Sequence, residues 1–123
     1  MIQNLSIDLE TRSSVDIVKS SVYRYAESDD FDILLFGVSV NHGPIRVYDL
    51  VQGDIVPEEI LKAVTDDTVE KWAYNSSFER VCLSVWLRRK HPEFFSSYGE
   101  GLYLDPSAWK CSLVTVCPSG WKR

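Results

Sequence analysis

Two carboxylates near the start of the chain have a spacing that suits metal chemistry. Residues 5–10 alternate strictly between apolar and polar side chains, which predicts a β-strand. Asp8 and Glu10 then share one face of that strand, roughly 7 Å apart. Carboxylates in this arrangement suit hard divalent cations such as Mg²⁺ or Mn²⁺. The pair is also typical of any strand with one water-facing side, so the strand alone does not decide between the two roles.

A third carboxylate, Glu79, stands in the first turn of the longest predicted helix, directly after a predicted strand at residues 69–74. Ser76 and Glu79 have the spacing of a capping box, in which Glu79 only satisfies the backbone and complements the helix dipole. Asn75 likewise suits a helix cap. Each of these residues therefore has a purely local role available to it.

The elements that must position these residues predict an α/β fold with a mixed sheet and flanking helices. Three strands precede the first regular helix and indicate an antiparallel meander, while the later helix–strand alternation indicates parallel strands added to it. Ser13 and Asp16 form a weak capping box that predicts a short irregular helix. The expected elements are strands at 5–10, 31–40, 45–50 and 69–74, helices within 13–26, 57–65 and 75–90, a loop at 93–101, and a strand end followed by a helix start at 109–116.

Composition excludes several classes of protein. The 123 residues suffice for one domain, and 45% hydrophobic with 25% charged residues is typical of a globular chain. A net charge of −5 disfavours a basic nucleic-acid coat protein but not an enzyme that holds its own carboxylates. The three cysteines are odd in number and form no CxxC pair, which disfavours a disulfide framework or zinc and favours a reducing cytoplasm. No apolar run approaches the length of a membrane helix.

Two motifs taken together resemble a known family. Asp8-Leu9-Glu10-Thr11 and Asn75-Ser76-Ser77-Phe78-Glu79 resemble the first two motifs of the DEDD-type 3′–5′ exonucleases, whose fold is ribonuclease H-like. The wider sequence, over residues 4–116, is similar to the exonuclease-like region at the N-terminus of the phage-type family A DNA polymerases. The segments that carry this closer resemblance are 20–27, 33–37, 71–75 and 109–112.

The resemblance implies roles for particular residues. Asp8, Glu10 and Glu79 would be the catalytic metal ligands of a two-ion Mg²⁺ or Mn²⁺ site, although the family more often has Asp where Glu79 stands. Thr11, Asn75 and Phe78 would contact the 3′-terminal nucleotide of single-stranded DNA. The reaction implied is metal-assisted phosphodiester hydrolysis. Tyr23, Arg24 and Tyr25 would also suit a single strand, but we favour packing against the sheet for them.

The sequence departs from the family at the third motif, a Tyr or His followed four or five residues later by Asp. We find no such pair after Glu79, so three carboxylates stand where the family uses four. We therefore expect one partial domain over residues 1–123, C-terminally incomplete and without a polymerase domain, with weak or no nuclease activity. Asp66, Asp105 or a second chain are candidates for the missing carboxylate.

A different class of function stays open. The chain would then be a non-catalytic nucleic-acid-binding module, a homodimer formed through uncovered apolar surface, or a prophage remnant with no selected role.

Overall fold

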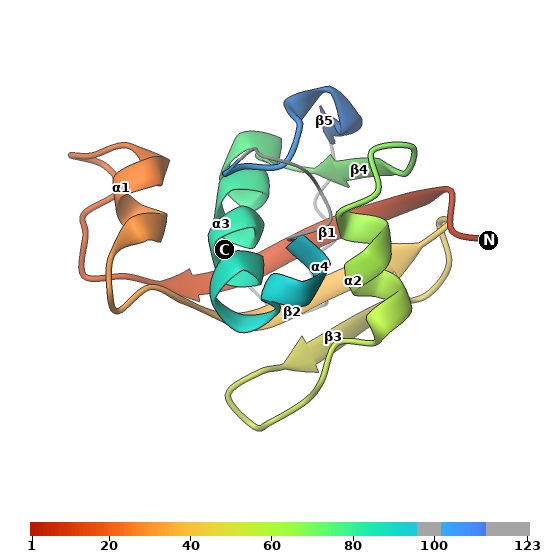
Figure 1. Cartoon of the computed structure of the whole chain (residues 1–123), viewed down its shortest axis with the longest axis horizontal. Helices are drawn as coiled ribbons and strands as arrows, with labels where there is room; N and C mark the ends of the chain where they lie inside the picture. Colours follow the sequence, from red (N-terminus) through yellow and green to blue (C-terminus); the bar gives the residue numbers. More distant parts are fainter. Residues whose placement is uncertain (96–101, 113–123) are drawn as a thin grey trace.

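The chain folds around one five-stranded sheet, and the computed structural model describes residues 1–95 and 102–112 (Figure 1). The strands are β1 (Asn4–Arg12), β2 (Asp32–Val40), β3 (Ile45–Asp49), β4 (Glu70–Ala73) and β5 (Trp109–Cys111). They lie in the order β3-β2-β1-β4-β5. The first three pair antiparallel, and β4 and β5 run parallel to β1. The predicted meander with its parallel extension is confirmed.

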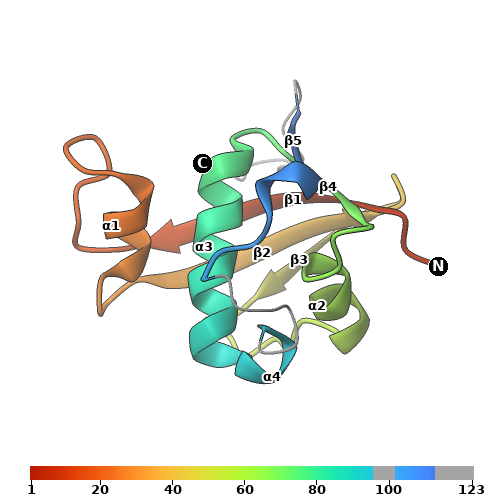
Figure 2. The same cartoon turned by 45° about the horizontal axis from the view of Figure 1, so that its top comes forward.

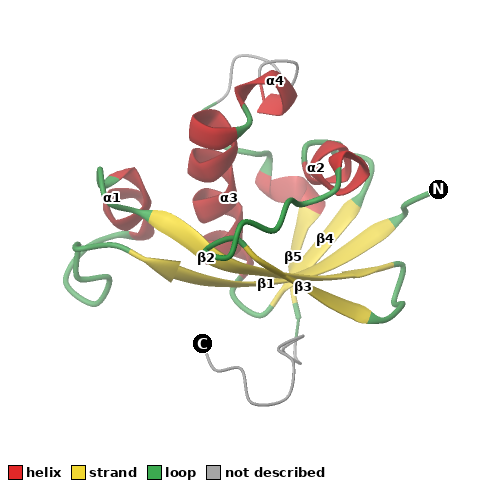
Figure 3. Cartoon of the chain, turned by 90° about the horizontal axis from the view of Figure 1, so that it is seen from below, coloured by secondary structure: helices red, strands yellow, loops and turns green. Residues whose placement is uncertain are grey.

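The helices flank this sheet on one side. They are α1 (Val22–Glu27), α2 (Glu58–Val64), α3 (Ser76–Lys90), α4 (Pro92–Phe95) and a 3₁₀ helix (Pro106–Ala108). The labelled helices α1 to α4 all lie over the same face of the sheet (Figure 3). The strand order and directions are compatible with a ribonuclease H-like fold. In the part of the chain that the structure describes, no helix is long and apolar enough to cross a bilayer.

The alternating sequence of β1 divides its side chains between the two faces of the sheet. Leu9 is buried on the helical side, opposite Phe36 in β2. The Phe36 ring lies 6.4 Å from the ring of Trp86 in α3, measured between centroids. Fully burying one such side chain contributes about 1.5–3 kcal/mol, so this apolar face fixes the register of β1. Asp8 and Glu10 consequently belong to the opposite face of the strand.

The two central parallel strands separate before they end. Their ladder stops at the pair formed by Ser6 and Trp72. β1 continues to Arg12 alongside β2, whereas β4 ends at Ala73 and the chain turns into α3. An opening therefore forms beside the second half of β1, with the start of α3 at its rim. In α/β sheets, ligand sites form at such places, beyond the carboxyl ends of diverging strands.

The segment between β1 and β2 differs from the prediction. Ser13 and Asp16 do not start a helix, because α1 begins only at Val22, with Ser21 as its N-cap. The Ser13 hydroxyl instead donates a hydrogen bond of 2.8 Å to the backbone carbonyl of Tyr25. A capping box does not form here because the hydroxyl is engaged by an element farther along the chain.

The later elements agree more closely with the predictions from the sequence. The long helix predicted over 75–90 is confirmed as α3, with its basic residues in the last turn, where the dipole favours them. The predicted loop at 93–101 is wrong at its start, because α4 continues the chain after Pro92. Residues 96–101, and the helix start expected within 113–116, lie outside the described residues.

Lys71 is a fully buried cation in the middle of β4. It stands between Leu5 and Trp109 in the ladders and has no solvent exposure. Its ammonium donates to the backbone carbonyl of Asp66, at the turn that follows α2. Burial lowers the pKa of Lys71 to about 8, partly offset by the nearby charges of Asp67 and Asp66. The fold thus holds a lysine that loses its proton more easily than in the unfolded chain.

We expect this lysine to make the fold more stable in mild alkali. Between about pH 8 and the model-peptide pKa of 10.5, the unfolded chain binds the proton that the folded chain has released. The free energy of unfolding therefore rises with pH across this window, by at most about 3 kcal/mol. Denaturant titrations give the free energies of unfolding of the wild type and of Lys71→Met at each pH. From pH 8 to 10.5, the wild-type value should rise relative to that of the variant. Parallel pH profiles for the two proteins would contradict the assignment.

Candidate nucleotide and metal site

A hollow of about 440 Å³ lies where β1 ends and α3 begins. Its lining residues are Leu9, Glu10, Thr11, Ile17, Tyr25, Tyr74, Asn75 and Phe78. Four of the six site residues predicted from the sequence are therefore brought together, from two motifs more than sixty residues apart in the chain. The opening between β1 and β4 places them there, because one motif lies in the second half of β1 and the other follows the end of β4.

One wall of the hollow is aromatic. The Tyr25 hydroxyl and the Thr11 Oγ1 are 2.8 Å apart and hydrogen-bonded. The Tyr25 ring lies 5.9 Å from the rings of both Phe78 and Phe31. Burial raises the pKa of Tyr25, an effect that the hydrogen bond with Thr11 only partly opposes. The phenol therefore stays neutral at physiological pH and offers an apolar ring with a polar tip.

The two carboxylates of β1 are withheld from water to different degrees. Asp8 is 1% exposed, and Glu10 is half-buried with its Oε1 shielded from solvent. Strand alternation puts both on the face opposite the helices. Glu10 also lines the hollow, whereas Asp8 is not among the lining residues. A ligand in the hollow would thus meet the carboxylate of Glu10 first.

Glu79 is the third carboxylate of the predicted site. It is fully buried in the first turn of α3, one residue after Phe78. Burial raises the pKa of the Cys82 thiol, and the charge of Glu79 adds to that effect. Glu79 is thus a buried acidic group in the first turn of α3, and it is not among the lining residues of the hollow.

The metal-binding role of these carboxylates stays a prediction. Their hard oxygen atoms are of the kind that Mg²⁺ and Mn²⁺ prefer, and Mg²⁺ is commonly held by one or two carboxylates together with water and substrate phosphates. Asp8 and Glu10 fit that pattern. Among residues 1–95 and 102–112, no three His, Cys, Asp or Glu side chains form a group that would hold a metal ion.

Asn75 has the local role that its type allows. It is the N-cap of α3, and its side-chain oxygen accepts a hydrogen bond of 3.4 Å from the backbone N–H of Phe78. The capping box expected from Ser76 does not form around that residue, because Asn75 is the N-cap and the helix starts one position earlier than the box requires. The Ser76 Oγ instead lies 3.2 Å from the Cys111 Sγ. Asn75 thus caps the helix and lines the hollow at the same time.

Sequence reasoning missed half of the lining. Tyr25 was assigned to packing, and it both packs and lines the hollow. Tyr74 directly precedes Asn75, the cap of α3, and its side chain is 58% exposed. An aromatic residue next to the second motif is the sequence signal that could have identified it. Ile17 could not be placed, because its segment has no regular structure to give it a direction.

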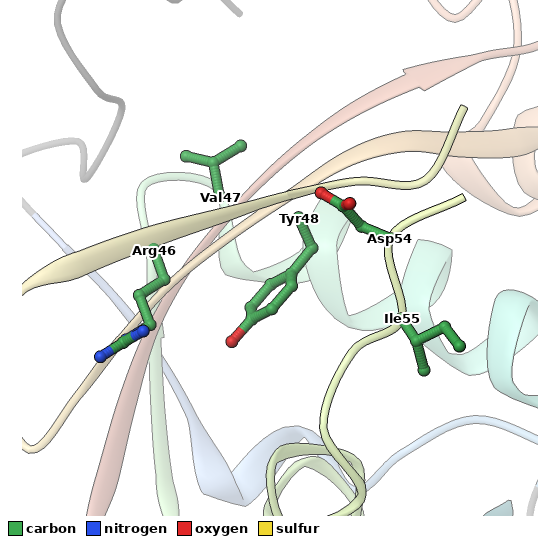
Figure 4. A pocket seen from close by; sticks show the side chains of 5 residues that line it. All are labelled: Arg46, Val47, Tyr48, Asp54 and Ile55. Carbon is green, nitrogen blue, oxygen red and sulfur yellow. The ribbon is translucent and has the colours of Figure 1, made fainter. Parts of the chain in front are cut away.

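A second hollow, of about 460 Å³, lies at the opposite edge of the sheet (Figure 4). Arg46 and Tyr48 point into it from β3, whereas Val47 points to the other side of the strand. Asp54 and Ile55 complete its lining. It contains none of the predicted site residues and serves below as a place for control substitutions.

Comparison with known proteins relates the chain to part of a phage DNA polymerase. It is 43% identical over 118 residues to the DNA polymerase of Bacillus phage SP02. The chain is homologous to a segment of a phage DNA polymerase. The match covers 96% of this chain and 16% of the polymerase, so the chain spans about a sixth of its relative's length. No family model matches the sequence, and no solved structure matches it.

The double role of Asn75 predicts different results for two substitutions. Asn75→Ala removes the cap and should lower the free energy of unfolding by about 1 kcal/mol. Asn75→Asp keeps an acceptor at the same place and should leave stability within a few tenths of a kcal/mol of the wild type. Thermal or urea unfolding measures both. Equal destabilisation by the two substitutions would show that the cap is not what Asn75 supplies.

Proposed function

We propose that this chain is a 3′–5′ exonuclease-like segment of a phage-type DNA polymerase, with a ribonuclease H-like fold. Its ligand would be the 3′ end of single-stranded DNA, together with Mg²⁺ or Mn²⁺. The observation that carries the proposal is the hollow in which Glu10 and Thr11 meet Asn75 and Phe78. The similarity to a phage DNA polymerase supports the same substrate class.

The chemistry of the hollow suits a terminal nucleotide. Base stacking on an aromatic side chain contributes about 1–3 kcal/mol per base and tolerates any sequence. Phe78, Tyr25 and the exposed Tyr74 offer such surfaces. Glu10 and Asn75 supply polar groups beside them. Among the described residues, the lining contains no Lys or Arg, so the hollow suits the base and sugar, and the phosphate would be left to a carboxylate-bound cation.

The proposed cation site uses the residues of β1. Asp8 and Glu10 would hold the ion together with an oxygen of the terminal phosphate, and Glu79 would act from the first turn of α3. A divalent cation at this place supplies a water of lowered pKa and stabilises negative charge on the phosphate. The chain's own contribution is to fix the terminal nucleotide between Phe78 and Glu10, so that its phosphate lies beside Asp8.

The isolated chain should hydrolyse DNA weakly or not at all. Three carboxylates are present where the family uses four, and positioning of the phosphate depends on each of them. Asp105, a candidate for the fourth, accepts a hydrogen bond from the backbone N–H of Ser107 and caps the 3₁₀ helix. A local role of this kind disfavours it as a metal ligand.

A non-catalytic module is the second proposal, and two observations favour it. The described residues contain no group of three potential metal ligands. The edge strand β3 and its following loop also carry exposed apolar side chains, among them Val47, Val51 and Ile55. Such an edge favours pairing with a second copy of the chain. In this case single-stranded DNA would bind in the hollow without a cation, and sedimentation would show a dimer.

The hollow predicts which aromatic side chain matters for binding. Phe78→Ala should weaken binding of a short 5′-labelled single strand about ten-fold, because it removes one stacking surface. Phe94→Ala is the matched control, since it removes a half-buried aromatic from α4, outside the hollow. Fluorescence anisotropy in Mn²⁺ measures both affinities. Equal affinities for the two variants would argue against the hollow as the nucleotide site.

The carboxylates predict a specific pattern of hydrolysis. Any Mn²⁺-dependent release of nucleotides from the 3′ end should disappear in Asp8→Asn and persist in Asp54→Asn, a carboxylate in the second hollow. Activity equal in both variants would identify a contaminating nuclease. Release at an ordinary enzymatic rate by the wild type, lost in Asp8→Asn, would show that a fourth carboxylate is present after all.

A further inference from the structure

The helix that carries Tyr25 is held in place by polar contacts. α1 has only six residues, too few for a helix that is stable by itself. Ala26 is its one fully buried residue, while Val22 and Tyr25 are partly buried against the core. α1 lies beside α3 (Figure 2). Its position therefore depends on contacts with other segments, and polar contacts are prominent among them.

Three side chains from three segments meet at the end of α1. The Glu27 Oε2 accepts hydrogen bonds from the Arg88 guanidinium at 2.8 Å and from the Tyr103 hydroxyl at 2.7 Å. The Arg88 guanidinium also lies over the Tyr103 ring, 5.1 Å from its centroid. We name Glu27, Arg88 and Tyr103 the Glu27 cluster. It joins α1 to the last turn of α3 and to the segment that leads into β5.

Neighbouring contacts strengthen this junction. Arg89 donates hydrogen bonds to the backbone carbonyls of Glu27 and Ser28, at 3.0 and 2.9 Å. These carbonyls belong to the end of α1, where a helix leaves acceptors without partners of its own. The ring of Tyr23, also in α1, packs edge-on against the ring of Tyr103 at 5.0 Å. α1 is therefore held along its length by α3 and by the segment around Tyr103.

The position of α1 decides the position of Tyr25. Tyr25 lies two residues before Glu27 in the same short helix, and its ring and hydroxyl form a wall of the hollow. Its contacts with Thr11 and Phe78 require α1 to stay within reach of both β1 and α3. A shift of α1 by a few ångströms would open that wall.

We propose that the Glu27 cluster positions Tyr25 in the wall of the hollow and thereby sets the affinity of the site for the 3′ end of a single strand. This inference rests on the function proposed above. The three residues are positioning residues, because none of them lines the hollow. Partly exposed ion pairs and single hydroxyl hydrogen bonds are individually weak. The effect of removing one is therefore a change in affinity of a few fold.

The test uses Tyr103→Phe, which removes one hydroxyl and keeps the ring. We expect it to speed hydrogen exchange of the backbone amides in residues 22–27 of the free protein, with the centre of α3 unchanged. Affinity for a short oligothymidylate should fall about two- to five-fold. In a Tyr25→Ala background, Tyr103→Phe should have no further effect on affinity. Tyr48→Phe, in the second hollow, is the control and should change neither measurement.

Each result distinguishes this inference from the function on which it rests. Unchanged exchange in residues 22–27 overturns the positioning role, whatever the affinities are. An affinity loss that persists in the Tyr25→Ala background also overturns it, because the cluster would then act by another route. If the wild-type chain does not bind the oligonucleotide, the proposed function fails and with it the cluster's role in affinity. The exchange rates would still decide whether the cluster holds α1.

Discussion

β1 has an antiparallel neighbour on one side and a parallel neighbour on the other, and the two neighbours follow it for different lengths. Its hydrogen bonds to β2 continue to the end of the strand, whereas those to β4 stop after Ser6. The chain beyond β4 must then leave the sheet, and it does so as α3. The site depends on this separation, because Glu10 and Thr11 stand on one side of the opening and Asn75 and Phe78 on the other.

Several polar groups are buried in the core. Lys71 has a backbone carbonyl for its ammonium, and Ser84 bonds to the backbone of Arg80 and Leu104. These groups join segments that are distant in the sequence. Asp8 and Glu79 are also buried, and a carboxylate removed from water costs free energy unless its charge is compensated. Buried carboxylates near a hollow are typical of functional sites, which is why we connect them with the proposed chemistry.

The sheet could be predicted from the sequence because its signals are local. Leu5, Ile7 and Leu9 alternate with polar residues, and this period of two specifies both the strand and its faces. α3 was predictable for the same reason, through its apolar spacing and its basic last turn. α1 could not be predicted in this way, because its start depends on Ser21 and its position depends on Arg88 and Tyr103, which lie far along the chain. No sequence pattern shows which distant side chains will meet a six-residue helix.

The site shows the same division between local and long-range information. The structure brings Glu10, Thr11, Asn75 and Phe78 of the two motifs together at one opening, because one motif lies in the second half of β1 and the other follows β4. Motif spacing did not indicate that Glu79 would be fully buried and outside the lining of the hollow. Which side chains of α3 are covered depends on how the helix packs against distant parts of the chain, and the local pattern does not contain that information.

The most direct test of the account is the place where Mn²⁺ binds. Substoichiometric Mn²⁺ added to the ¹⁵N-labelled chain broadens the amide resonances nearest the ion, and the effect falls steeply with distance. The account predicts that residues 8–11 and 74–79 broaden first and together, and that Asp8→Asn abolishes this pattern. Broadening centred on another acidic stretch, such as Asp29–Asp32, with residues 8–11 unaffected, would contradict it.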